Sequence, residues 1–99
     1  MSKKRIVVTG MGVVSCFGTD VDQYYQALLE GRSGIRPITA FNPDDYPTRF
    51  AGQVRPFEVG DLMDKKQERR VDPFIRYAMV AGKKALLHGG LDLAHLDCL

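Results

Sequence analysis

Two residues of this chain could act as nucleophiles, the cysteines Cys16 and Cys98. A cysteine thiol becomes reactive when a helix N-terminus or a nearby cation lowers its pKa and a base can take its proton. Cys16 precedes a predicted helix, but no histidine lies near it in the sequence. Cys98 has even less chemical context. We therefore expect both thiols to be structural or incidental, and we expect Cys16 to be unreactive.

The two histidines do not form a metal-binding pattern. His88 and His95 lie seven residues apart and have no matched pair of cysteines. A structural zinc site needs four closely grouped ligands from such residues. We expect both histidines to be solvated surface residues. No residue of the chain is assigned a catalytic, cofactor-binding or metal-binding role.

A glycine pair follows a hydrophobic run at Gly10-Met11-Gly12. Glycines at this position can let a backbone approach a pyrophosphate at a helix N-terminus, as in dinucleotide-binding domains. The full pattern G-x-G-x-x-G would need a third glycine where Ser15 stands. Tight packing or a bulge in a strand is the favoured interpretation of the two glycines. The N-terminal segment of an NADP-binding oxidoreductase is kept as an alternative.

Positive charge is concentrated at Lys65-Lys66-Gln67-Glu68-Arg69-Arg70, which carries four cations and one anion. In a helix, Lys66, Arg69 and Arg70 share one face because they are three and four residues apart. Such a face could steer an acidic partner into place. The alternative is a solvated charged helix with Glu68 and Asp72 as local partners. A nucleic-acid site is not expected, because no aromatic residues interleave with these charges.

The elements that position these residues begin with a strand predicted over 4–14. Ile6, Val7 and Val8 are consecutive β-branched residues without polar alternation, which is typical of a strand covered on both faces. A helix is predicted over 20–30, with Thr19 as its N-cap and Gly31 beyond its end. This order of elements favours an α/β protein.

The middle of the chain, 33–60, is predicted to be irregular because four prolines interrupt it. Short extended pieces are expected near 34–41 and 49–54. A short helix is predicted over 65–70, with Asp64 as its N-cap.

A longer helix is predicted over 73–88. Asp72-Pro73 provides an N-cap followed by proline at the first helical position, and Gly89-Gly90 ends the helix. Its composition predicts burial around most of its circumference. Arg76, Lys83 and Lys84 are the residues left for water.

Composition places the chain among ordinary globular proteins. It has 99 residues, 44% of them hydrophobic and 26% charged, with a net charge of +2. No apolar run approaches the roughly 18 residues of a membrane span, and the N-terminus lacks the pattern of a signal peptide. We expect a cytoplasmic protein with free thiols.

Three segments, Val7–Gly12, Leu28–Ile35 and Arg69–Phe74, together resemble the start of the β-ketoacyl-[acyl carrier protein] synthases, most closely the type II enzymes. The resemblance implies a thiolase-like, layered α/β/α fold that is incomplete in this chain. Residues 1–99 would be the N-terminal portion of the N-terminal synthase domain.

The resemblance also implies an activity. These acyltransferases elongate fatty acids by decarboxylative Claisen condensation of malonyl-acyl carrier protein with an acyl-enzyme thioester. They act without a cofactor as cytoplasmic homodimers, and their partner is the acyl- or malonyl-loaded acyl carrier protein, not a nucleic acid or a membrane. Their catalytic cysteine and two histidines lie downstream of the region matched here, so this chain alone is expected to be inactive. A non-catalytic partner subunit similar to a chain-length factor is a further alternative.

The same resemblance gives the basic helix a partner. Positions matching Lys65, Lys66, Arg69 and Arg70 contribute to carrier-protein docking in the family. Because acyl carrier proteins are acidic, a basic face near the substrate entrance would favour their association.

Overall fold

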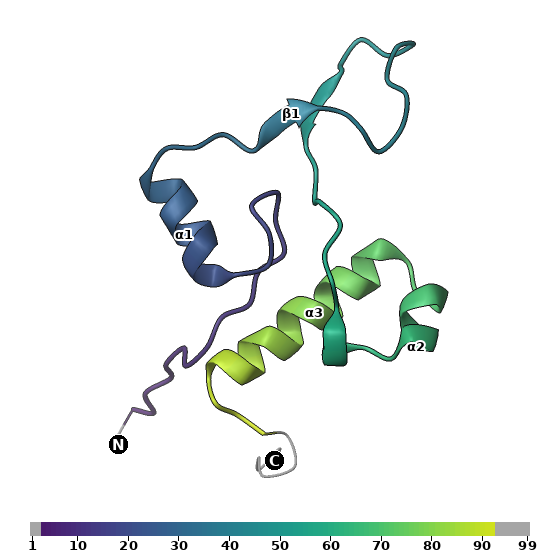
Figure 1. Ribbon diagram of the computed structural model, residues 1–99. Coiled ribbons are helices and arrows are strands. Elements are labelled where there is room, and N and C mark those ends of the chain that lie inside the picture. Colours follow the sequence, from purple (N-terminus) through teal and green to yellow (C-terminus); the bar gives the residue numbers. More distant parts are fainter. Residues whose placement is uncertain (1–2, 93–99) are drawn as a thin grey trace.

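The computed structural model describes residues 3–92. The described chain contains three α-helices, α1 (Val21–Leu29), α2 (Lys65–Arg70) and α3 (Pro73–His88), and a short 3-10 helix, η1 (Gly60–Leu62). Two short strands, β1 (Ile35–Pro37) and β2 (Phe50–Gly52), form a hairpin that projects away from the helices (Figure 1). No helix in the described part of the chain is long and apolar enough to cross a membrane.

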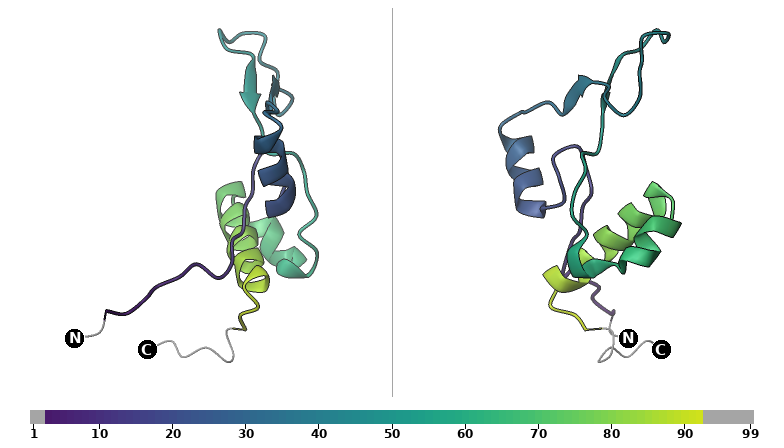
Figure 2. Two further views of the ribbon diagram at one scale, coloured as in Figure 1. Left: turned by 90° about the vertical axis from the view of Figure 1, so that its left-hand side faces the viewer. Right: turned by 45° about the vertical axis from the view of Figure 1, so that its right-hand side comes forward.

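The molecule is elongated. Its extents are 60 × 37 × 24 Å, with a Cα radius of gyration of 17.4 Å, whereas a compact domain of this length has about 13 Å. Further views show the β1–β2 hairpin at one end of the molecule and the start of the N-terminal segment at the other (Figure 2).

The N-terminal segment differs from the strand predicted over 4–14. Within residues 3–92 no strand pairs with it, and the exposed fractions of Ile6, Val7 and Val8 are 94%, 66% and 82%. A strand needs a neighbour to share its backbone hydrogen bonds. The β-branched sequence therefore runs extended, but the described chain supplies no neighbouring strand.

The second half of this segment packs against α3 through its glycines. A Cβ on Gly12 would overlap the carbonyl oxygen of Ala81 and approach within 2.9 Å of Ala85 N. A Cβ on Gly10 would overlap Ala85 O and approach within 2.5 Å of Gly89 N. Only glycine allows this close approach of the two backbones.

Helix α1 lies within the predicted range, but Asp20 is its N-cap instead of Thr19. Asp20 Oδ1 accepts hydrogen bonds from the backbone N–H groups of Asp22 at 2.8 Å and Gln23 at 3.4 Å. Thr19 is engaged elsewhere, because Lys84 Nζ donates to its Oγ1 at 2.7 Å. Beyond the helix end, Gly31 adopts a φ of 68°, a conformation that glycine tolerates best.

The irregular region contains the β1–β2 hairpin, which pairs antiparallel with Ile35 opposite Gly52 and Pro37 opposite Phe50. The Gln53 side chain braces the start of the long connection. Its Oε1 accepts from the N–H groups of Thr39 at 3.1 Å and Ala40 at 3.0 Å.

Helix α3 has the predicted bounds, but it is far less covered than its composition predicts. Val80 is fully buried, whereas Phe74 and Leu87 are 69% and 68% exposed. The chain contributes cover to only one side of this helix. The apolar residues on its other side have no layer packed over them within the described residues.

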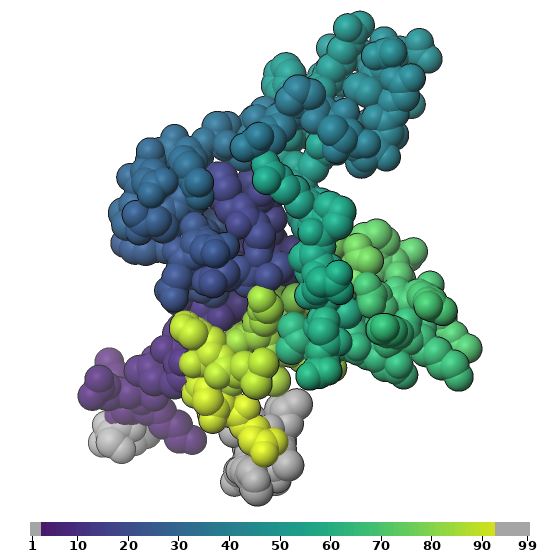
Figure 3. Space-filling view, viewed as in Figure 1, coloured from purple at the N-terminus to yellow at the C-terminus, as the bar shows by residue number. Residues whose placement is uncertain are grey.

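The core lies where η1, the segment before it and α3 meet. Val59, Met63 and Val80 form its buried centre. Phe57, Val71 and Met79 pack around them as partly buried residues. In the space-filling view, the green segments around η1 and α2 and the yellow-green α3 form one continuous block. The β1–β2 hairpin projects away from this block (Figure 3).

Candidate docking surface on helix α2

Helix α2 is short, and both of its ends are anchored. Asp64 caps its start, where the carboxylate accepts from the Lys66 N–H at 3.2 Å. Met63 before the helix is buried in the core, and Val71 after it packs on that core. A six-residue helix would be unstable alone. Its position is therefore set by the core beneath it.

Helix α2 carries four exposed cations, Lys65, Lys66, Arg69 and Arg70. We call these four residues the α2 basic surface. The helix lies at the outer edge of the molecule (Figure 1). Among residues 3–92, none of the four side chains forms an ion pair. Their charge is therefore directed to the solvent.

The acids proposed as local partners are engaged differently. Glu68 faces α3, where its Oε1 lies 4.0 Å from Arg76 Nη1. Asp72 is the N-cap of α3 through its backbone carbonyl oxygen, which accepts from the N–H groups of Ile75 at 3.0 Å and Arg76 at 3.1 Å, while its carboxylate makes no cap hydrogen bond. Among residues 3–92, neither acid forms an ion pair with a cation of the α2 basic surface.

The cations of α3 are not simply solvated, which corrects the prediction from sequence. Lys83 Nζ donates to Leu62 O at the end of η1, and Lys84 Nζ donates to Thr19 O and Oγ1. The Arg76 guanidinium lies over two aromatic rings. These three side chains connect α3 to the segments that pack around it.

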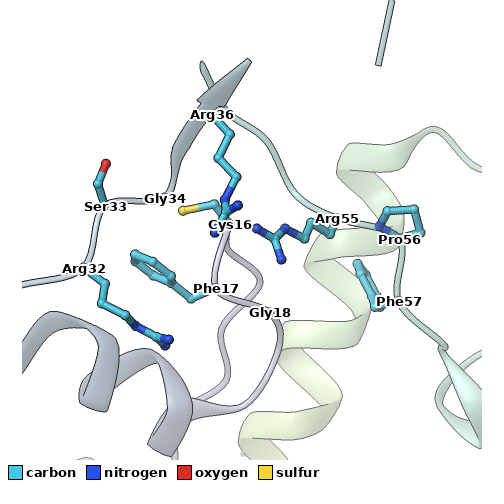
Figure 4. A pocket seen from close by; sticks show the side chains of 10 residues that line it. All are labelled: Cys16, Phe17, Gly18, Arg32, Ser33, Gly34, Arg36, Arg55, Pro56 and Phe57. Atoms are coloured by element: carbon cyan, nitrogen blue, oxygen red, sulfur yellow. The ribbon is translucent and has the colours of Figure 1, made fainter. Parts of the chain in front are cut away.

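Cys16 lies at the tip of a tight turn in which Ser15 and Gly18 bond to each other's backbone at 3.0 Å. It lines a cleft of about 330 Å³, into which the side chains of Arg36 and Arg55 point (Figure 4). Cys16 Sγ packs against Gly34, where a Cβ would overlap it. No histidine of residues 3–92 lines the cleft. The thiol fills space between two backbone segments, and within that range no base lies beside it.

His88 has a specific partner, although it is exposed as predicted. Its Nδ1 accepts a hydrogen bond from the Met11 N–H at 2.9 Å, which ties the N-terminal segment to the end of α3. His95 and Cys98 lie outside the described residues. Within 3–92, no three His, Cys, Asp or Glu side chains come together to hold a metal ion.

The glycine pair is not free to bind a dinucleotide. Gly10 and Gly12 lie against the backbone of α3, so no space is left there for a pyrophosphate. The nearest following helix, α1, begins only at Val21. This geometry removes the basis for the oxidoreductase alternative.

The sequence did not predict that Arg76 of α3 lies beside Glu68 of α2. Arg76 lies eight residues after Glu68 and on a different helix, so no helical spacing relates the two. The available signal was a cation within a predominantly apolar helix, which indicates a specific contact more often than a free charge.

Comparison with known proteins identifies the family of this chain. A model of the family described as "Beta-ketoacyl synthase, N-terminal domain" matches residues 3–98. The chain therefore belongs to the β-ketoacyl synthase family.

Individual relatives are similar over nearly the whole chain. The chloroplastic 3-oxoacyl-[acyl-carrier-protein] synthase I of Arabidopsis thaliana is 56% identical over 85% of this chain and 18% of its own length. The 3-oxoacyl-[acyl-carrier-protein] synthase 2 of Vibrio harveyi is 47% identical over 94% of this chain and 22% of its own length. The chain thus spans about a fifth of the length of these curated relatives.

A solved structure establishes the fold. The ishigamide ketosynthase/chain length factor superposes with a TM-score of 0.73 and 33% identity, over 96% of this chain and 24% of that one. The three helices and the small sheet are therefore part of a ketosynthase, thiolase-like fold.

Proposed function

We propose that this chain is the N-terminal portion of the N-terminal domain of a 3-oxoacyl-acyl carrier protein synthase, an acyltransferase that elongates fatty acids. The observation that carries the proposal is the family match over residues 3–98. Relatives named as such synthases, at 40 to 56% identity, support it. We call the protein that would include the rest of the domain the longer protein. We propose that it is a cytoplasmic homodimer.

In the proposed reaction, an acyl chain first moves from the carrier thioester to a cysteine thiol. Malonyl-carrier protein then loses carbon dioxide, and the resulting carbanion attacks the acyl-enzyme thioester. A carbon–carbon bond forms, the carbon–sulfur bond breaks, and 3-oxoacyl-carrier protein results. The cysteine and two histidines that perform these steps would belong to the longer protein beyond this chain.

The role that we assign to the described residues is binding of the acyl carrier protein at the α2 basic surface. Support comes from four exposed cations that form no ion pair within the described part of the chain, on a helix anchored by the core. An acidic partner would be steered toward such a surface, and the rigid base would fix its orientation.

Charge reversal in the longer protein tests this role. We expect Lys66→Glu with Arg69→Glu to lower kcat/KM for carrier-bound substrates by about tenfold, because exposed charges contribute ~0 to 1 kcal/mol each and reversal adds repulsion. Activity on a small pantetheine thioester should stay nearly unchanged. Higher ionic strength should shrink the difference between variant and wild type.

The matched control is Arg36→Glu with Arg49→Glu, which makes the same charge change on the projecting hairpin. It should leave both substrates nearly unaffected. Equal loss with both substrates in the α2 variant would mean that the surface supports the fold. No loss with either substrate would mean that it is only a solvated face.

A second candidate is a non-catalytic partner subunit similar to a chain-length factor. The superposed structure, which its title describes as a ketosynthase/chain length factor, favours keeping it. Sequencing downstream of the Leu99 codon separates the two, because a synthase needs a cysteine nucleophile in the remaining reading frame.

A further inference from the structure

A hollow of about 380 Å³ lies between α2 and α3. Its lining consists of Lys65, Glu68 and Arg69 from α2 and Arg76 from α3. We call it the α2–α3 hollow. Three of the four lining side chains are cations, so the charge of the hollow suits a carboxylate, and its volume leaves room for an Asp or Glu side chain.

Arg76 is held in place before any partner arrives. Its guanidinium carbon lies 5.8 Å from the ring centroid of Phe57 and 5.6 Å from that of Tyr77. Cation–π contacts of this kind attract the guanidinium group to the rings and restrain its position. The Nε atom is enclosed and has no hydrogen-bond partner among the described residues. The terminal nitrogens therefore provide the donors that remain usable.

These donors are not saturated by Glu68. The distance from Arg76 Nη1 to Glu68 Oε1 is 4.0 Å, which is beyond hydrogen-bond length. Both side chains keep about a third of their surface exposed, 32% for Arg76 and 30% for Glu68. A closer carboxylate from outside could thus take the guanidinium donors.

Binding a partner costs Arg76 less side-chain conformational entropy than it costs Lys65 or Arg69. Lys65 and Arg69 are exposed and have no ion-pair partner in the described chain, so they lose rotamer freedom when a partner immobilises them. Arg76 is already ordered by its two rings. Its partial burial also weakens screening of its charge by water and salt.

We propose that Arg76 extends the α2 basic surface and anchors one acidic side chain of the carrier protein in the α2–α3 hollow. This inference rests on the docking role proposed above. It assigns the largest single contribution to a residue on α3, whereas the cations of α2 itself contribute mainly steering.

The first test uses Arg76→Gln in the longer protein, with Arg49→Gln on the hairpin as the matched control. We expect Arg76→Gln to lower kcat/KM for carrier-bound substrates by about tenfold, as for an anchoring arginine, and Lys65→Gln by about threefold or less. The loss should appear in KM, and the pantetheine thioester should react normally. Arg76→Lys should not restore wild-type KM, because it lacks the planar group.

A second test does not depend on Arg76 variants being folded. We expect Glu68→Gln to tighten binding of unloaded acyl carrier protein by about threefold in a fluorescence anisotropy titration, because it removes the competing carboxylate. Glu58→Gln, at an exposed acid outside the hollow, makes the same charge change and should tighten binding less.

Several results would overturn the inference. Arg76→Gln could leave kcat/KM for carrier-bound substrates as Arg49→Gln does, while Lys66→Glu with Arg69→Glu lowers it. In that case the α2 basic surface binds the carrier protein, but Arg76 does not anchor it. If Glu68→Gln binds no more tightly than Glu58→Gln, the hollow does not receive the partner. If the α2 double variant itself is unimpaired, the docking role and the anchor fail together.

Discussion

At the scale of single residues, position in the packing decides what a chemically capable side chain does. Cys16 could have been a nucleophile by type, yet its Sγ fills the space against Gly34. His88 could have been a free base, yet its Nδ1 accepts from the Met11 N–H. Neither contact could be predicted from the sequence, because each joins residues distant along the chain.

For Cys16 we expect Cys16→Ser in the longer protein to keep condensation within about threefold of wild type, because a nucleophilic thiol needs an activating base and no histidine of residues 3–92 lies beside this one. The side chains have nearly the same size. Acyl-enzyme formation can be measured by mass spectrometry. Loss of the acyl-enzyme in a folded variant would contradict this assignment.

At the scale of elements, signals within a few residues predicted the helices well. Helix α3 begins after the N-cap Asp72, at Pro73, and ends before Gly89. Gly31 follows the end of α1. The N-cap of α1 was misplaced by one residue because Thr19 bonds to Lys84, 65 residues away. The strand predicted over 4–14 does not form for a related reason. A strand needs a neighbouring strand, and none of the described residues provides one for this segment.

The residues of the proposed docking site show the same division. The four cations of the α2 basic surface could be recognised from their spacing, because they all lie on one short helix. Arg76 could not be assigned to that site. Its place depends on the angle at which α3 follows α2 and on the rings of Phe57 and Tyr77.

The contact between the N-terminal segment and α3 gives a prediction at this scale. Gly12→Ala should lower the unfolding free energy of the longer protein by about 1 to 3 kcal/mol, because the new Cβ overlaps the α3 backbone at Ala81. Gly82→Ala is the control, since a Cβ at that position would meet no other segment of the described residues within 4 Å. Urea unfolding measures both. Equal midpoints for the two variants would show that this close approach does not stabilise the fold.

At the scale of the whole molecule, the chain has more apolar surface than it can cover. Ile6 is 94% exposed, Val8 82% and Phe74 69%. We expect the 99-residue chain on its own to self-associate and to be poorly soluble, because exposed apolar surfaces of this kind promote aggregation. Static light scattering should show species much larger than 11.1 kDa. A stable monomer at micromolar concentration would contradict this expectation.

We propose that this part of a β-ketoacyl synthase contributes scaffold and partner binding, while the reacting groups lie in the rest of the longer protein. The most direct test is the release of labelled carbon dioxide from malonyl-carrier protein in the presence of acyl-carrier protein. We predict release by the longer protein and none above the blank by the 99-residue chain alone. Release by the chain alone would place the condensing chemistry within these residues and contradict the claim.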